Sequence, residues 1–373
     1  MISGDRSLAQ GKRGAFYNTL EEFHKYWNRI DIICPRVNYI NAETLNPKSE
    51  ILKKSQITNS KAIKVFDNVF IHSSPWPLWL QPWWILKKGK EIYQEQKFDL
   101  MTVHEYPPFY NGLGARMLWN KIKVPYILEI FHIIGYPKTA SLKEKIYRRF
   151  FYFFIKYDCR KAKAVRVMNS QVAEKLAELG IPESKIELIP AIYADLDIFK
   201  PLDLEKKYDL IFVGRLAKNK GINLLVESAS KLKIQNPNFK LLIVGSGPLR
   251  ESLKLKVKSL KLENNVIFHG WAKDSREIAK LLNESRILIM PSYNEGGPRV
   301  VIEAMACGLP ILATPVGVVA SIMKKGTFGE IITWDPEDIA KKAHSLLSNQ
   351  SIYRQYGQAG PKVILFFEKK SAI

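Results

Sequence analysis

Short apolar runs alternate along the chain with longer amphipathic stretches, and this alternation restricts the possible folds more than any other feature of the sequence. In the first half, the runs that we expect to form strands cover residues 30–34, 64–71, 100–104, 126–131 and 164–168. They are rich in β-branched and aromatic residues, whereas several stretches between them have the period of amphipathic helices. The alternation predicts an α/β protein whose parallel sheets are covered by helices.

A polar segment at residues 199–207 interrupts this pattern before it restarts at residues 208–213. Further strands are expected at residues 240–244, 265–268, 287–290 and 311–313. We therefore predict two doubly wound, Rossmann-like domains at residues 1–200 and 201–355, followed by a segment at residues 356–373 that packs back toward the N-terminal domain. Ligands of such sheets bind at the carboxyl ends of the strands, so two facing domains place the site in the cleft between them.

The 373 residues carry a formal net charge of +21, which favours polyanions, phosphorylated small molecules or anionic membrane surfaces as partners. The three cysteines are widely spaced and include no Cys-x-x-Cys, so neither a disulfide framework nor a zinc site is expected, and a reducing cytoplasm fits best. No stretch approaches the roughly 18 apolar residues that span a bilayer. We expect a cytoplasmic protein, with a peripheral position on the inner face of the cell membrane as the alternative.

The strongest local motif joins a predicted strand to a predicted helix at residues 213–221. Gly214 follows the strand, and Arg215 and Lys220 precede the helix. Such a loop brings backbone N–H groups, a helix N-terminus and positive charge to one point. A diphosphate suits that point, because arginine offers a bidentate fork and lysine a compact charge. An ordinary surface turn with solvated lysines is the alternative.

A second strand-to-helix turn, at residues 241–249, contains Gly245 and Gly247. Glycine permits a positive φ and a close approach of the backbone to a ligand. A single Gly-x-Gly is weak evidence. It gains weight here because it is the second such turn in one domain, on what should be a neighbouring strand.

The third and most specific motif covers residues 290–310. A buried strand is expected to end at Pro291, Pro298 to stand in the first turn of a helix, and Gly308 and Pro310 to end that helix.

Two glutamates, Glu295 and Glu303, lie within this third motif. Gly296 and Gly297 precede the helix, and with its N-terminus they predict an anion-binding concavity. Glu303 has apolar neighbours, so its carboxylate is costly to bury unless it accepts hydrogen bonds, for instance from sugar or ribose hydroxyls. A solvated glutamate on an amphipathic helix is the alternative.

In their order and spacing, the three segments resemble the nucleotide-binding domain of the retaining family 4 glycosyltransferases, which have the GT-B fold. The resemblance is strong over residues 208–329 and weak before residue 100. It implies that Arg215 and Lys220 hold the donor diphosphate. It also implies that Glu303 binds the ribose hydroxyls and that Glu295 contacts the transferred sugar. The segment at residues 296–299 departs from the family's commoner Gly-Phe-Gly, which leaves the identity of the sugar open.

The resemblance extends to three further sites. Gly270 and Trp271 match the place where the family's backbone meets the base. His132 follows a strand that resembles the one ending in the family's active-site histidine, so it would point into the cleft and bind the donor sugar; a strand-end residue without a role is the alternative. His104, which also stands at the end of a predicted strand, is a weaker candidate for a site residue.

The N-terminal loop at residues 4–14 also resembles the family. Gly11 and Gly14 match the glycine loop after the first strand, which faces donor and acceptor. Only three residues precede this loop, so we expect either that the chain begins inside its first strand or that its true start lies upstream.

The resemblance implies an enzyme that moves a sugar from a nucleotide-diphosphate donor to an acceptor hydroxyl with retention of configuration. No cofactor or metal is expected, because Arg215, Lys220 and two helix N-termini can neutralise the departing diphosphate. That diphosphate would take the acceptor proton, and Glu295 and His132 would complete the catalytic set. A GT-B sugar-nucleotide epimerase and a basic nucleic-acid-binding protein are the alternatives, although no nucleic-acid-binding module is recognised.

Basic and aromatic residues crowd one segment, at residues 143–166. The cations are Lys143, Lys145, Arg148, Arg149, Lys156, Arg160, Lys161, Lys163 and Arg166. Two interpretations stand: a helix that lies on an anionic bilayer, or a core helix with a solvated basic edge. The first implies a lipid-linked acceptor, as in the assembly of cell-surface polysaccharide or glycolipid.

Overall fold

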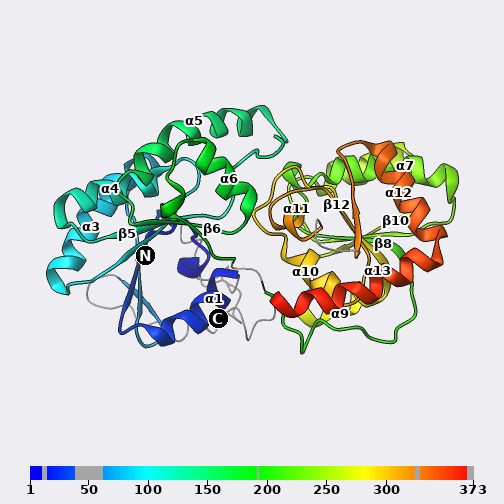
Figure 1. Ribbon diagram of the computed structural model, residues 1–373, viewed down its shortest axis with the longest axis horizontal. Helices are drawn as coiled ribbons and strands as arrows, with labels where there is room; N and C mark the ends of the chain where they lie inside the picture. The colour runs from blue at the N-terminus through cyan, green and yellow to red at the C-terminus, as the bar shows by residue number, and fades with distance from the viewer. Residues whose placement is uncertain (11–14, 38–61, 191–192, 324–327, 368–373) are drawn as a thin grey trace.

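The computed structural model describes residues 1–10, 15–37, 62–190, 193–323 and 328–367, and it contains two α/β domains side by side (Figure 1). The described helices include none that is both long enough and apolar enough to cross a membrane. All three cysteines are free and buried. The domain limits near residues 200 and 355 stay predictions.

The N-terminal domain is built on a sheet in two hydrogen-bonded groups, ordered β1-β3-β2 and β4-β5-β6-β7. The strands are β1 (Ile30–Cys34), β2 (Ile63–Val65), β3 (Val69–Ser73), β4 (Met101–His104), β5 (Tyr126–Ile130), β6 (Ala164–Val167) and β7 (Ile186–Leu188). Ile2 lies between the groups, in parallel bridges to Ile33 of β1 and Val103 of β4. The segment around Ile2 therefore occupies the place of a strand between β1 and β4.

The prediction of a single strand at residues 64–71 is wrong. The chain turns at Phe66, which has a φ of 58°, and β2 pairs antiparallel with β3. The Asn68 side chain braces the turn by donating to the carbonyl oxygens of His24 and Trp27, at 2.8 and 2.6 Å. The sheet is thus mixed. Asp67 and Asn68 interrupt the apolar residues and are typical of a turn, but the prediction joined the two flanking pieces into one strand. The strands β7 and β13 (Gly329–Ile331) were also not predicted.

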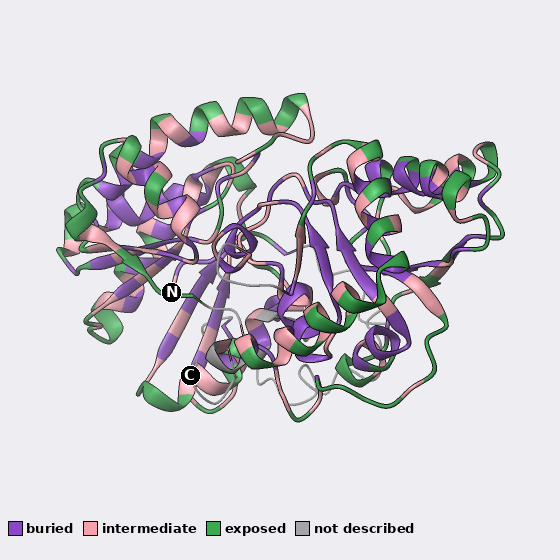
Figure 2. Cartoon of the chain, turned by 45° about the vertical axis from the view of Figure 1, so that its right-hand side comes forward, coloured by how far each residue is buried: buried purple, intermediate pink, exposed green. Residues whose placement is uncertain are grey.

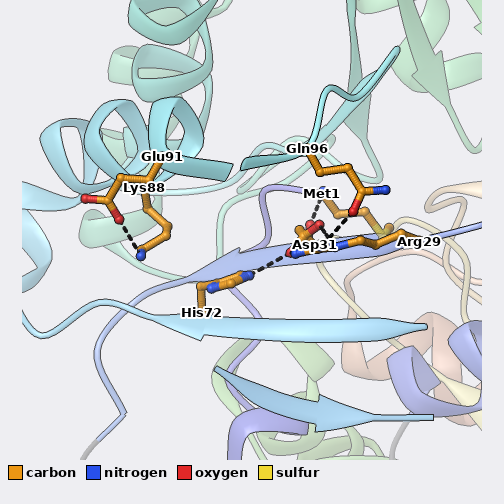
Figure 3. A network of polar contacts seen from close by, with 7 residues as sticks. All are labelled: Met1, Arg29, Asp31, His72, Lys88, Glu91 and Gln96. Carbon is orange, nitrogen blue, oxygen red and sulfur yellow. Dashed lines mark hydrogen bonds and ion pairs between the residues drawn. The ribbon is translucent and has the colours of Figure 1, made fainter. Parts of the chain in front are cut away.

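A polar network joins β1 to its surroundings (Figure 3). Asp31 accepts a hydrogen bond from Nε of Arg29 at 2.8 Å, and Nε2 of His72 lies 2.8 Å from its Oδ1. Arg29 also donates to Gln96 at 2.7 Å. Because His72 belongs to β3, the network ties β3 to its parallel neighbour β1.

Helices cover both faces of this sheet. They are α1 (Ala15–Phe23), α3 (Gln81–Glu95), α4 (Tyr110–Ile122), α5 (Leu142–Cys159) and α6 (Ser170–Glu178). Figure 1 shows α1 on one side of the sheet and α3, α4 and α5 on the other. Two apolar clusters, one around α1 and one around α3 and α4, form the core on the two faces.

The C-terminal domain has six parallel strands in the order β10-β9-β8-β11-β12-β13. They are β8 (Tyr208–Val213), β9 (Leu241–Val244), β10 (Val266–Gly270), β11 (Ser285–Met290), β12 (Ile311–Ala313) and β13. Ile211 packs into one apolar cluster, whereas Leu210 and Phe212 pack into the other, so both faces are buried. In sequence terms this is the 3-2-1-4-5-6 order of dinucleotide-binding sheets, whose switch point lies between β8 and β11.

The helices of this domain complete its two outer layers. They are α7 (Ile222–Gln235), α8 (Arg250–Ser259), α9 (Ser275–Asn283), α10 (Arg299–Ala306), α11 (Val318–Ile322), α12 (Pro336–Ser348) and α13 (Gln350–Val363). After α13, Ile364 belongs to the core cluster that contains α10. The carbonyl of Phe367 accepts a hydrogen bond from the N–H of Ala194, at 3.0 Å. The predicted course of residues 356–373 toward the N-terminal domain stays a prediction, and residues 368–373 lie outside the described part.

Candidate functional site

The loops that follow β8 and β11 meet at the switch point of the C-terminal sheet. The N–H of Tyr293 donates to the carbonyl of Asn219 at 2.8 Å. Gly221 starts α7 with a φ of 66°, and a Cβ there would lie 1.9 Å from the carbonyl oxygen of Pro291. Only glycine combines that backbone conformation with so close an approach. The first and third sequence motifs are therefore packed against each other.

Three predicted glycines stand in line at the carboxyl ends of β8, β9 and β10. Gly214 donates its N–H to Val244 at 2.9 Å, and Gly245 donates to Gly270 at 2.6 Å. A Cβ at Gly245 would lie 2.0 Å from the carbonyl of Gly214, and one at Gly247 would lie 2.5 Å from the carbonyl of Leu216. The two glycine turns are thus packed backbone to backbone, so a ligand above them would meet main chain rather than side chains.

Lys220 and Glu295 form an ion pair between the two loops. Ser292 adds a hydrogen bond from its hydroxyl to Oε1 of Glu295, at 3.2 Å. Arg215 differs, because its side chain is exposed and no polar partner is found for its guanidinium among the described residues. The site therefore holds one paired cation and one free cation next to the glycine turns.

Glu303 lies on α10, one turn inside the helix, and is 9% exposed. Burial raises the pKa of its carboxyl to about 7, and the charge of Arg299 opposes that shift. In the described part of the chain its carboxylate has no hydrogen-bond partner. Pro298 is the N-cap of α10 rather than a member of its first turn, and Gly308 follows the helix with a φ of 74°.

His132 brings the N-terminal domain to this site. It follows β5 by two residues, and a Cβ added to Gly296 would lie 3.3 Å from the His132 Cβ. The ring is open to solvent but crowded by protein atoms, and the lost hydration lowers its pKa. The Glu295 carboxylate opposes this shift and the Lys220 ammonium adds to it, so both charges act on the ring.

The two domains are held together beside Glu295 by side chains from the start of α6. Asn169 donates to the carbonyl of Gly296 at 2.7 Å. Gln171 donates to the carbonyl of Pro315 at 2.9 Å and accepts from the N–H of Gly317 at 2.8 Å. Asn169 is also the N-cap of α6, since its Oδ1 accepts from the N–H of Val172 at 3.0 Å. Its contact with the other domain was missed, and no local sequence signal reveals it.

A second contact between the domains lies at Asn294, the neighbour of Glu295. Its amide donates to the carbonyl of Lys138 at 3.1 Å and to Glu144 at 3.0 Å. The N–H of Lys138 in turn donates to Tyr293 at 3.3 Å. The loop after β11 is therefore fixed from both sides by the N-terminal domain.

The remaining predicted residues lie apart or are not described. His104 is engaged elsewhere: Nε2 lies 2.6 Å from Glu129, and Nδ1 lies 3.2 Å from the hydroxyl of Ser3. Trp271 follows β10 with 76% of its surface exposed, next to Gly270, which has a φ of 89°. Gly297 lies between Gly296 and the N-cap of α10. Gly11 and Gly14 lie outside the described residues.

Groups of three or more His, Cys, Asp and Glu side chains that could hold a metal ion are not found among the described residues. The chain does contain an Asp-x-Asp, at Asp195 and Asp197. There, Oδ1 of Asp195 accepts the N–H of Asp197 at 3.1 Å, as in a local turn. The absence of a metal requirement stays a prediction.

Comparisons with known proteins agree with this arrangement. Residues 195–363 match the family described as glycosyl transferases group 1, and residues 69–191 match the glycosyl transferase 4-like domain. The N-acetyl-alpha-D-glucosaminyl L-malate synthase of Bacillus anthracis is 25% identical over 313 residues, which are 79% of this chain and 79% of that protein.

Two solved structures share the fold. Sucrose-phosphate synthase from Thermosynechococcus elongatus superposes with a TM-score of 0.78 at 20% identity, over 100% of this chain and 95% of that one. Anabaena Alr3699/HepE, solved in complex with UDP and glucose, superposes with a TM-score of 0.71 at 15% identity, over 98% and 94% of the two chains. The fold is therefore GT-B, with two Rossmann-like domains.

Proposed function

The chain belongs to the group 1 glycosyl transferases, which retain anomeric configuration, and on that premise we propose that it uses a nucleotide-diphosphate sugar as donor and a glycan hydroxyl as acceptor. In this proposal the C-terminal domain binds the donor and the N-terminal domain the acceptor. The observation that carries it is the meeting of Lys220, Glu295 and the glycine turns at the switch point of the C-terminal sheet.

Each side chain has a role in this proposal. Arg215 and Lys220 bind the diphosphate, and the glycine turns admit it close to the main chain. Glu303, a buried carboxyl without a partner in the described chain, accepts hydrogen bonds from the ribose hydroxyls. The backbone at Gly270 and the neighbouring Trp271 meet the base.

The chemistry follows from where charge develops. As the bond between sugar and diphosphate breaks, negative charge grows on the leaving group, and Arg215 and Lys220 stabilise it. The acceptor hydroxyl attacks from the face that the diphosphate leaves and passes its proton to a diphosphate oxygen. Glu295 and His132 hold the sugar from the two domains. Since the pKa of His132 is lowered, its ring is neutral near pH 7 and can accept or donate a hydrogen bond.

A panel of nucleotides tests the donor site. UDP is the first candidate, because the structure of HepE contains it, and GDP and ADP complete the panel. We expect one of them to raise the melting temperature of the wild type in a concentration-dependent way. Arg215→Ala, Lys220→Ala and Glu303→Ala should each abolish the rise, whereas Lys218→Ala, on the same loop but exposed, should keep it. A full response from all three site variants would refute the assignment.

We also propose a lipid-linked acceptor at an anionic membrane, with the protein peripheral on it. Helix α5 lies at the outer edge of the N-terminal domain and exposes much of its surface (Figure 2). Its exposed apolar side chains, each at least 44% accessible, are Leu142, Ile146, Phe150, Phe153 and Tyr157. Their spacing of three and four residues places them on one face. Exposed cations among them are Lys143, Lys145, Arg149 and Lys156. This combination favours the surface of an anionic bilayer over a buried core helix.

Co-sedimentation with vesicles tests this surface. We expect binding to phosphatidylglycerol vesicles at low salt and weak binding to phosphatidylcholine vesicles. Phe150→Ser combined with Phe153→Ser should lower the bound fraction severalfold. Leu255→Ser, at an equally exposed apolar residue of the C-terminal domain, is the matched control and should change nothing. Equal binding by both variants would exclude α5 as the contact.

A further inference from the structure

A cavity of about 230 Å³ opens at the carboxyl ends of β1 and β4, in the N-terminal domain. Pro35, which follows β1, and Tyr106, two residues after β4, both line it. Because β4 and β5 are parallel neighbours, this is the same edge of the sheet that carries His132. The rings of His104 and Phe131, 5.1 Å apart, connect the two strand ends. The cavity therefore lies on the side of the sheet where doubly wound domains bind ligands.

Positive charge at this cavity is not neutralised by its neighbours. Arg6 lines the cavity, and within the described chain its guanidinium has neither an ion pair nor a hydrogen bond. The adjacent Asp5 accepts the N–H of Ser7 at 2.7 Å instead. Glu105 lies nearby, but its carboxylate oxygens accept the N–H groups of Gly112 and Tyr106, and burial raises the pKa of its carboxyl.

Two helices begin at the same place. Gln81 is the first residue of α3 and Tyr110 the first residue of α4, and both line the cavity. The N-terminal ends of helices carry partial positive charge. With Arg6, they give the cavity three sources of positive potential from three separate segments.

Gln81 supplies an independent observation. Its side chain is 1% exposed, and neither its amide oxygen nor its amide nitrogen has a hydrogen-bond partner among the described residues. An unpaired buried amide lowers stability, and such groups recur where a ligand or water completes the hydrogen bonds. A donor and an acceptor on one residue suit the hydroxyls of a sugar.

From these observations we propose that this cavity binds the acceptor through an anionic group, a phosphoryl group or a carboxylate, that pairs with Arg6. Gln81 binds a neighbouring hydroxyl or oxygen of the same molecule. Tyr106 forms one wall, and it can do so only because a glycine lies beneath it: a Cβ at Gly4 would lie 0.9 Å from the tyrosine hydroxyl oxygen. This inference rests on the proposed transfer reaction and names the chemistry of its acceptor.

Calorimetric titration of the full chain with hexyl phosphate tests the proposal. The Arg215→Ala, Lys220→Ala double variant serves as the background, so that the donor site does not contribute. We expect saturable binding that Arg6→Gln weakens at least tenfold. Gln81→Leu should weaken it severalfold while leaving the melting temperature of the free protein unchanged or higher. Arg354→Gln, an exposed arginine on α13, should bind as the background does.

The outcomes separate the possible sources of the anion. Tighter binding of hexyl phosphate than of inorganic phosphate indicates a lipid phosphate as the source. Equal binding of the two indicates a free phosphate. Either result supports the site if the Arg6→Gln variant loses that binding. The proposal is overturned if Arg6→Gln binds hexyl phosphate with unchanged affinity. It is also overturned if the uncharged hexanol binds as tightly as hexyl phosphate does. The nucleotide-induced rise in melting temperature should persist in Arg6→Gln alone. Its absence from the wild type would instead count against the donor site.

Discussion

The side-chain amide of Asn169 donates a hydrogen bond to the carbonyl oxygen of Gly296, 2.7 Å away in the other domain. The same side chain caps α6 through its oxygen, so one residue both starts a helix and holds the loop that carries Glu295. A Cβ at Gly296 would lie 2.3 Å from the carbonyl of Phe131, so the main chains of the two domains also approach each other closely here.

The two functions of Asn169 can be separated by substitution. Asn169→Asp keeps the oxygen that caps α6 but loses the donor to Gly296, and it sets a carboxylate against a carbonyl. We expect near-wild-type stability and a fall in kcat/KM of about fivefold to tenfold, from one lost hydrogen bond between domains. Asn169→Ala should in addition lose about 1 kcal/mol of unfolding free energy, because the cap is gone. Urea unfolding and steady-state rates measure both, and equal rates in wild type and Asn169→Asp would exclude the contact from catalysis.

Substitution of Glu295 and substitution of Lys220 should change the affinity for the nucleotide in opposite directions. In the unliganded protein Glu295 neutralises Lys220, so a bound diphosphate competes with it for the ammonium. Glu295→Gln frees Lys220 and should tighten the binding of the nucleoside diphosphate, while transfer falls because the sugar loses a contact. Lys220→Met should weaken nucleotide binding and lower the rate by about 10²-fold. Calorimetric titration and initial rates separate these effects. Weaker nucleotide binding by Glu295→Gln would contradict the competition.

Nucleotide affinity should depend on pH through Glu303. Burial raises the pKa of this carboxyl to about 7, so it is protonated in the free protein below that pH and ionised above it. The ionised form accepts two hydroxyl hydrogen bonds, so the dissociation constant should fall as pH rises from 6 to 8. In Glu303→Gln that inflection should disappear, because the amide does not titrate. Titrations at several pH values, with a nucleotide lacking the ribose hydroxyls as a second control, provide the measurement.

A buried pair of acids in the N-terminal domain should make stability depend on pH. A Cβ at Gly112 would lie 2.2 Å from Oε2 of Glu105 and 2.5 Å from Oδ2 of Asp158, so the two carboxyls are neighbours. Both Asp158 oxygens lack a hydrogen-bond partner in the described chain. Burial raises the pKa of Asp158 to about 8, and the charge of Arg116 opposes the shift.

The sign of this dependence follows from the direction of the shift. Between about pH 4 and about pH 8 the Asp158 carboxyl keeps its proton in the folded state and loses it in the unfolded state. The free energy of unfolding therefore falls as pH rises through this range. Asp158→Asn removes that loss, and we expect it to gain about 1–3 kcal/mol over wild type at pH 8 and little at pH 4. Urea unfolding at the two pH values tests this. A constant difference between the two proteins would disprove the linkage.

Much of the C-terminal domain could be predicted from sequence because its signals are local. Strands β8, β9 and β11 are apolar runs, and each functional turn carries its own glycines, as at Gly214 and Gly245. The prediction failed at residues 64–71, where Asp67 and Asn68 mark a turn and a positive φ at Phe66 makes the segment an antiparallel hairpin. The edge strands β7 and β13 have three residues each, too few to show a period.

The sequence by itself determined the alternation of strands and helices, the glycine turns, and the family to which the chain belongs. The strands, helices and turns depend on residues close together in the sequence, and the family resemblance depends on the order and spacing of three such motifs. Only the tertiary structure decided that Lys220 pairs with Glu295, that Asn169 reaches Gly296 across 127 positions, and that Arg6 stands unpaired beside Gln81. Such contacts depend on how the sheets and domains are placed in space, because hydrogen bonds and ion pairs act over a few ångströms whatever the distance along the chain.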